Sequence, residues 1–126
     1  MNHRVEAPLS MPRKLAIRLL HEAQIATQPF SGVVTAPADE TSPPDTWQPC
    51  TESAIPATVG ALNPERRAWA IYRFDPALEK AEPNLFQPLP ELLQLNAVLT
   101  TKGVLQLRAW HLWQESMQEQ VLQIED

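Results

Sequence analysis

The stretch LNAVLTTKGVLQLRAWHLW, residues 95–113, decides the predicted fold, because two strand-forming runs flank a short turn signal in it. Residues 95–101 and 104–113 lie on either side of Lys102 and Gly103, so we expect them to pair as an antiparallel β-hairpin. Successive side chains of a strand point to opposite faces, and one face of the second run carries Leu105, Leu107 and Ala109. The C-terminal third of the chain is therefore predicted to be β.

The clearest helical period lies near the N-terminus, in SMPRKLAIRLLHEAQIATQP, residues 10–29. Pro12 suits a first helical turn and Pro29 ends the pattern, which predicts a helix over residues 13–27. Its apolar residues recur at spacings of three and four on one stripe: Leu15, Ala16, Leu19, Leu20, Ala23 and Ala26.

The rest of the chain is read as short strands joined by proline-rich connections. Residues 37–56 are acidic and rich in proline, serine and threonine, which predicts a long surface loop. Residues 81–93 are interrupted by prolines and cannot form a long helix. The predicted strands besides the hairpin are residues 30–36, 57–62, 68–72 and 120–125. One helix ahead of several strands predicts an α+β domain, with the helix packed on a mostly antiparallel sheet.

Composition limits the class of protein. The 126 residues, 44% of them hydrophobic and 20% charged, indicate a single folded domain over residues 1–126. A net charge of −5 disfavours nucleic acid and anionic membranes as partners. No apolar run is long enough to cross a bilayer, and residues 1–10 lack the apolar stretch of a secretory signal, so we expect a cytoplasmic protein.

Few residues suggest a cofactor or a catalytic group. With 13 prolines, 3 glycines and no glycine-rich phosphate-binding motif, the sequence predicts no cofactor. Cys50 is the single cysteine and lies in a proline-flanked loop, which is typical of a free thiol. His3, His21 and His111 are scattered and form no metal-binding pair.

A charged corner follows one predicted strand, in the stretch AIYRFDP, residues 70–76. Arg73 and Asp75 are two residues apart, so their side chains should point to the same side. Paired polar side chains at a strand end are compatible with a functional site and equally with a solvated surface corner. The sequence leaves both interpretations open.

Three stretches of this chain resemble the JAMM/MPN metalloprotease domain of bacteria. Residues 95–112 are similar to the strand pair that closes that domain, in which a TKG-type turn leads into a strand much like LQLRAW. Residues 10–24 resemble its first helix, entered by an I-P step, and residues 30–36 resemble its next strand, usually E-x-C-G-L-L. The resemblance implies a cytidine-deaminase-like fold over most of the chain, with the second helix shortened or missing.

The family hydrolyses amide or isopeptide bonds with zinc, often beside a ubiquitin-like or sulfur-carrier protein. Two histidines and an aspartate hold the metal, a glutamate accepts a proton from the bound water, and a serine stabilises the oxyanion. In the resemblance the glutamate position is occupied by Pro29, which precedes Ser31 and Gly32 at the usual C-G pair. Proline cannot accept a proton, so the general base is missing.

The metal positions have changed as well. AIYRFDP aligns with G-I-Y-H-S-H-P, so that Arg73 and Asp75 replace the two histidines while Pro76 is kept. The following segment places Asn84 at the serine and Gln87 at the metal-binding aspartate. In a second alignment, the same stretch matches an earlier family segment that ends in I-D-P, and the H-x-H-P segment is then absent. Both alignments imply a domain without zinc and without the family's catalysis.

The expected function is therefore binding. The resemblance implies an inactive JAMM/MPN-like scaffold whose partner is a sulfur-carrier or ubiquitin-like protein or an active relative. The candidate binding groove contains Tyr72, Phe74 and Phe86, and Arg73 with Asp75 could fill the former metal pocket as an ion pair. Two alternatives remain, a hydrolase with a non-standard site and an unrelated small α+β interaction domain. The sequence leaves the oligomeric state open, although an exposed strand edge would be compatible with a dimer.

Overall fold

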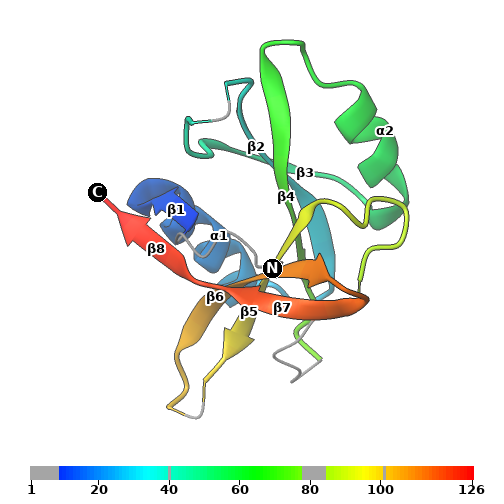
Figure 1. Ribbon diagram of the computed structural model, residues 1–126. Helices are drawn as coiled ribbons and strands as arrows, with labels where there is room; N and C mark the ends of the chain where they lie inside the picture. The colour runs from blue at the N-terminus through cyan, green and yellow to red at the C-terminus, as the bar shows by residue number, and fades with distance from the viewer. Residues whose placement is uncertain (1–8, 40, 78–84, 101) are drawn as a thin grey trace.

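The computed structural model describes residues 9–39, 41–77, 85–100 and 102–126, and it is an α+β domain built on one six-stranded sheet (Figure 1). The longer helix covers one face of the sheet and the shorter helix lies against the other. The elements are β1 (Leu9–Pro12), α1 (Arg13–Ile25), β2 (Phe30–Pro37), β3 (Thr46–Pro49), η1 (Glu52–Ala54), α2 (Ile55–Gly60), β4 (Arg66–Phe74), β5 (Leu93–Leu99), β6 (Leu105–Trp113), β7 (Ser116–Gln120) and β8 (Leu122–Glu125).

The strand order of the large sheet is β3-β2-β4-β5-β6-β7. Its neighbouring strands are antiparallel except for β4 and β5, which run in parallel. The register of β2 on β4 shifts between Val34 and Thr35, where a bulge interrupts the ladder. The prediction of a mostly antiparallel sheet is confirmed.

The predicted hairpin is formed by β5 and β6. Asn96 lies opposite Arg108 and Leu99 opposite Leu105, so the pairing extends along both strands. Gly103 takes a left-handed conformation with φ of 78° and donates its N–H to the Thr100 carbonyl at 2.9 Å, which closes the turn. A side chain would be strained in that conformation, so glycine suits this position.

The predicted N-terminal helix is confirmed as α1. Pro12 precedes its first residue, and the side chains of Leu15, Leu19 and Ala23 are buried against the sheet. These residues share a hydrophobic core with Leu107 of β6. The helix therefore packs on the sheet that contains the predicted hairpin.

Two predictions about the middle of the chain are wrong. Residues 57–62 are not a strand, because Ile55 and Val59, four residues apart, pack together on the sheet as one helical face of α2. Residues 37–56 are not only a loop. They contain η1 and also β3, which adds to the sheet because Trp47 enters the core opposite Val34.

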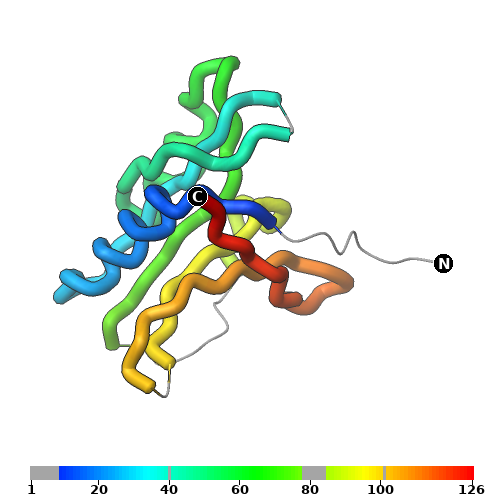
Figure 2. The backbone as a smooth tube through the Cα atoms, turned by 90° about the vertical axis from the view of Figure 1, so that its left-hand side faces the viewer, coloured from blue at the N-terminus to red at the C-terminus, as the bar shows by residue number. Residues whose placement is uncertain are grey.

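The last predicted strand is present as β8, but it lies outside the large sheet. It pairs in parallel with β1, so Leu9 lies opposite Leu122 and Met11 opposite Ile124. Figure 2 shows these two segments side by side, in blue and red. The strand that leads into α1 is thus fixed by pairing with a strand from the other end of the sequence.

The two faces of the sheet bury different kinds of side chain. The face under α1 is apolar, and on it the Tyr72 hydroxyl donates to the Leu19 carbonyl at 2.7 Å. Burial raises the pKa of Tyr72. The other face buries Val33, Ile71 and, unusually, the amide side chain of Gln94. Among the described residues, no helix is long and apolar enough to cross a membrane.

Candidate functional site

Three of the positions singled out by the sequence, Ser31, Arg73 and Phe86, lie together on the face of the sheet opposite α1. Ser31 of β2 lies directly opposite Arg73 of β4. Gln94 of β5 lies opposite Ile71, two residues before Arg73 and therefore on the same face. We call Ser31, Arg73 and Gln94, together with the covering side chains of Glu52 and Phe86, the strand-end cluster.

Arg73 is the centre of this cluster. Its Nη1 donates to Glu52 Oε1 at 2.9 Å, and its Nη2 donates to Gln94 Oε1 at 3.3 Å. The guanidinium carbon lies 5.5 Å from the centre of the Phe86 ring, a distance at which cation and ring attract each other. The Arg73 side chain is 20% exposed, so it is held largely inside the protein.

Gln94 is a buried hydrogen-bond partner of Arg73. It is 1% exposed, and its Nε2 donates to the Leu92 carbonyl at 3.3 Å while its Oε1 accepts from Arg73. Both ends of the buried amide are thereby hydrogen-bonded, which is what burial of a polar group requires. The polar groups of the Gln94 side chain are therefore satisfied inside the protein.

Ser31 is hydrogen-bonded to the segment that follows β3. Its Oγ donates to the Cys50 carbonyl at 2.8 Å, and the Cys50 N–H donates to the Ser31 carbonyl at 3.1 Å. Ser31 is 8% exposed and Cys50 is a half-buried free thiol. These bonds attach the segment after β3 to the start of β2, and they position Glu52 near Arg73.

The remaining site positions lie apart from this cluster. The expected ion pair between Arg73 and Asp75 is replaced by the pair with Glu52, while Asp75 Oδ1 accepts the Ala77 N–H at 2.9 Å. Pro29 and Gln87 are exposed. Asn84 lies outside the described residues.

The three aromatic residues of the candidate groove do not line one surface. Tyr72 is fully buried in the core under α1, and Phe86 is 6% exposed in the core on the opposite face of the sheet. Phe74 is half-buried and packs against Phe30, with ring centres 5.6 Å apart. Strand alternation explains this separation, because Tyr72 and Arg73 point to opposite faces.

The cluster holds a cation and a carboxylate in contact. Among the residues in the described ranges, no three His, Cys, Asp or Glu side chains come together as a possible metal site. His21 is exposed on α1, and His111 of β6 contacts the Glu91 carbonyl at 3.4 Å.

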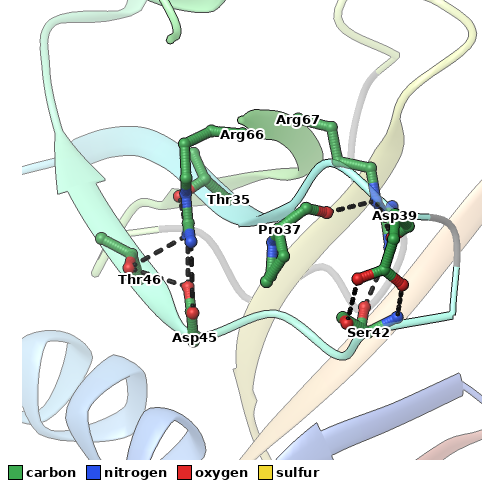
Figure 3. A network of polar contacts seen from close by, with 8 residues as sticks. All are labelled: Thr35, Pro37, Asp39, Ser42, Asp45, Thr46, Arg66 and Arg67. Atoms are coloured by element: carbon green, nitrogen blue, oxygen red, sulfur yellow. Dashed lines mark hydrogen bonds and ion pairs between the residues drawn. The ribbon is translucent and has the colours of Figure 1, made fainter. Parts of the chain in front are cut away.

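A second polar network, not predicted from the sequence, lies at the start of β4 (Figure 3). Arg66 Nη2 donates to Thr35 Oγ1 at 2.9 Å, and Arg66 also forms an ion pair with Asp45. This pair holds the pKa of Asp45 below its usual value. Arg66 thus joins β2, β4 and the residue before β3.

Arg67, the next residue, fixes the turn between β2 and β3. Its Nε donates to the Pro37 carbonyl at 3.0 Å and its Nη2 to the Ser42 carbonyl at 2.9 Å. Within that turn, the Asp39 carboxylate accepts the N–H of Thr41 and the N–H of Ser42, both at 2.9 Å. Figure 3 shows the contact with Ser42. Arg66 and Arg67 of β4 therefore hold the connection between β2 and β3 by hydrogen bonds and an ion pair. Composition alone did not predict these contacts.

Asp39 should titrate at unusually low pH. Hydrogen bonds from the hydroxyls of Ser42 and Thr41 to its ionised form lower its pKa from 3.8 to about 2. Because the folded-state pKa is depressed, the resulting stability is present above pH 3.8 and is lost as the pH falls towards 2. An NMR titration of the Asp39 carboxyl carbon should give this low midpoint, and Ser42→Ala should move it towards 3.8. An Asp39 midpoint near 3.8 in the unsubstituted protein would contradict the described turn.

Comparison with known proteins bears on the fold alone. No protein-family model matches the sequence, and no curated protein does. The chain is similar to the solution structure of protein DSY2949 from Desulfitobacterium hafniense, with a TM-score of 0.67 over 94% of this chain and 93% of that chain. The two sequences are 12% identical, so the likeness shows a shared fold.

Proposed function

We propose that this chain is a catalytically inactive JAMM/MPN-like domain that acts by binding another protein. The observation that carries the proposal is the environment of Arg73, at a position where the resemblance places a zinc-binding histidine. Its guanidinium is bound to Glu52 and Gln94 and stacked near Phe86. A cation held at this point repels a metal ion, so the arrangement favours a structural role for the former site.

The fold supports the proposal in two further respects. The resemblance requires the N-terminal helix to pack on the sheet that contains the C-terminal hairpin, and α1 shares its core with β6. A short α2 before β4 agrees with a second helix that is shortened.

The proposed partner is a sulfur-carrier or ubiquitin-like protein, or an active relative of this domain, because these are the proteins beside which the family works. The partner would approach the corner after β4. Pro76 and Ala77 are exposed there, and the half-buried ring of Phe74 lies at the end of the strand. The buried rings of Tyr72 and Phe86 support this corner from inside and take no direct part in binding.

Metal analysis and a cleavage assay test the inactivity. We expect purified protein to contain far less than one zinc per chain, and to leave a C-terminally extended sulfur-carrier or ubiquitin-like substrate intact after incubation with added zinc. Stoichiometric zinc, or cleavage that a chelator abolishes, would overturn the proposal.

A titration with the same carrier proteins, followed by NMR, tests the binding. We expect shifts at residues 73–77, and Ala77→Arg should abolish them because it places a long cation on the exposed corner. Gln24→Arg is the matched control, since Gln24 is exposed on α1. Equal binding by both variants would exclude this corner as the interface.

A further inference from the structure

The large sheet has two edges of different character, β3 and β7. Strand edges expose backbone groups that can pair with another chain, and proteins protect them with short strands, proline, lysine or bulges. The β3 edge has four residues and ends at Pro49. The β7 edge has five residues, SMQEQ, with neither proline nor lysine, and its register on β6 is regular. Within the part of the chain that the structure describes, β7 is the less protected of the two edges.

The pairing of β6 with β7 shows which backbone groups face outward. A loop of two residues, Gln114 and Glu115, joins the strands, and both have positive φ, 49° and 67°. Such a loop makes Trp113 and Ser116 the first hydrogen-bonded pair, and bonded and non-bonded pairs alternate from there. The backbone groups of Met117 and Glu119 therefore point away from β6.

The side chains of β7 present little charge to an approaching strand. Its only ionised residue is Glu119, whose Oε2 accepts from Arg108 Nε of β6 at 2.8 Å. Gln118 Nε2 donates to Ser116 Oγ at 2.8 Å. A second β7 could therefore approach without two unpaired carboxylates facing each other.

We propose that β7 pairs antiparallel with β7 of a second copy of this chain, which joins the two sheets into one. The twofold axis passes between the two Gln118 residues. Met117 of each copy then lies opposite Glu119 of the other, and their outward N–H and C=O groups form the hydrogen-bonded pairs. The outward-facing backbone groups of both β7 strands are then paired with each other. Because the contact is related by a twofold axis, neither copy has a free β7 edge left, so the assembly closes as a dimer.

The proposed contact is small, so the dimer should be weak and reversible. Interfaces this size lie at the low end of the range for specific association, and we expect a dissociation constant on the order of 100 µM. Sedimentation velocity of the full chain, measured from about 10 µM to about 1 mM, should show the mean mass rising from monomer to dimer.

Substitution of Gln118 by charged residues tests the proposed twofold axis. Because each Gln118 faces itself, Gln118→Lys and Gln118→Glu should each weaken dimerisation by about fivefold, since like charges then lie directly opposite. An equimolar mixture of the two variants should restore the dimer, because lysine then faces glutamate. Circular dichroism should show that both variants remain folded.

Met117→Pro provides an independent variant. It removes an N–H that points outward, so the ladder to β6 keeps its bonds while the new edge loses one donor in each copy. We expect a folded monomer over the whole concentration range. A monomeric unsubstituted protein at about 1 mM, a dimer unaffected by Met117→Pro, or a mixture of Gln118 variants that stays monomeric would each overturn the proposal.

Discussion

Replacing Gly32 with alanine should lower the free energy of unfolding by about 3 kcal/mol, as expected for a side chain forced into a filled core. An added Cβ would lie 2.3 Å from Cη2 of Trp47 and 2.5 Å from the Gln48 carbonyl oxygen. The indole cannot move aside, because its ring packs edge-on against Tyr72 and Phe30 at 5.3 and 6.2 Å. The Gln48 carbonyl belongs to the backbone of β3 and cannot rotate away.

Gly60→Ala is the matched control. Gly60 ends α2, and an added Cβ there meets no atom within 4 Å. This variant should be unchanged or more stable by up to about 1 kcal/mol, because alanine restricts the unfolded chain more than glycine does. Urea unfolding followed by circular dichroism measures both. Equal stability of the two variants would show that β3 does not pack Trp47 against Gly32.

Arg73→Ala should lower the free energy of unfolding by about 2 kcal/mol. The substitution removes the Arg73 donor from the buried side-chain oxygen Oε1 of Gln94, and it removes the cation beside the Phe86 ring. Glu52 contributes less to the loss, because its side chain is 57% exposed and water can replace the ion pair. Arg73→Met keeps the apolar stem and should lose about half as much.

Asp75→Ala is the control for Arg73→Ala. Asp75 lies two residues further along, and its carboxylate accepts only the exposed Ala77 N–H among the hydrogen bonds described for it. Its loss should cost no more than about 0.5 kcal/mol. If denaturant unfolding gives a similarly small value for Arg73→Ala, then the strand-end cluster is an ordinary solvated corner.

The elements that the sequence predicted are those whose signal is local. The hairpin has two strand-forming runs around Gly103, and α1 has an apolar stripe with a proline at its start. Neither requires knowledge of distant residues. The hairpin of β6 and β7 was missed because its loop, Gln114 and Glu115, lacks the glycine or asparagine that usually takes positive φ.

The candidate site was harder to predict because its contacts are distant in the sequence. The AIYRFDP stretch correctly indicated that Arg73 lies at a strand end, but its partner Glu52 is 21 residues away, in a segment that composition assigned to a loop. The alternation of β4 explains why Tyr72 could not share a groove with Phe86. A sequence pattern gives the side to which a residue points, but it does not give what covers that side.

The parallel pairing of β1 with β8 has a consequence for synthesis on the ribosome. Leu9 bonds to Val121 at 2.8 Å and lies opposite Leu122, so this contact joins residues more than a hundred positions apart. Closing so long a loop is slow and costs chain entropy. The start of α1 therefore stays unanchored on this side until residue 125 has been translated and released from the exit tunnel. Nascent chains that end before β8 should expose Met11, which the finished protein buries completely.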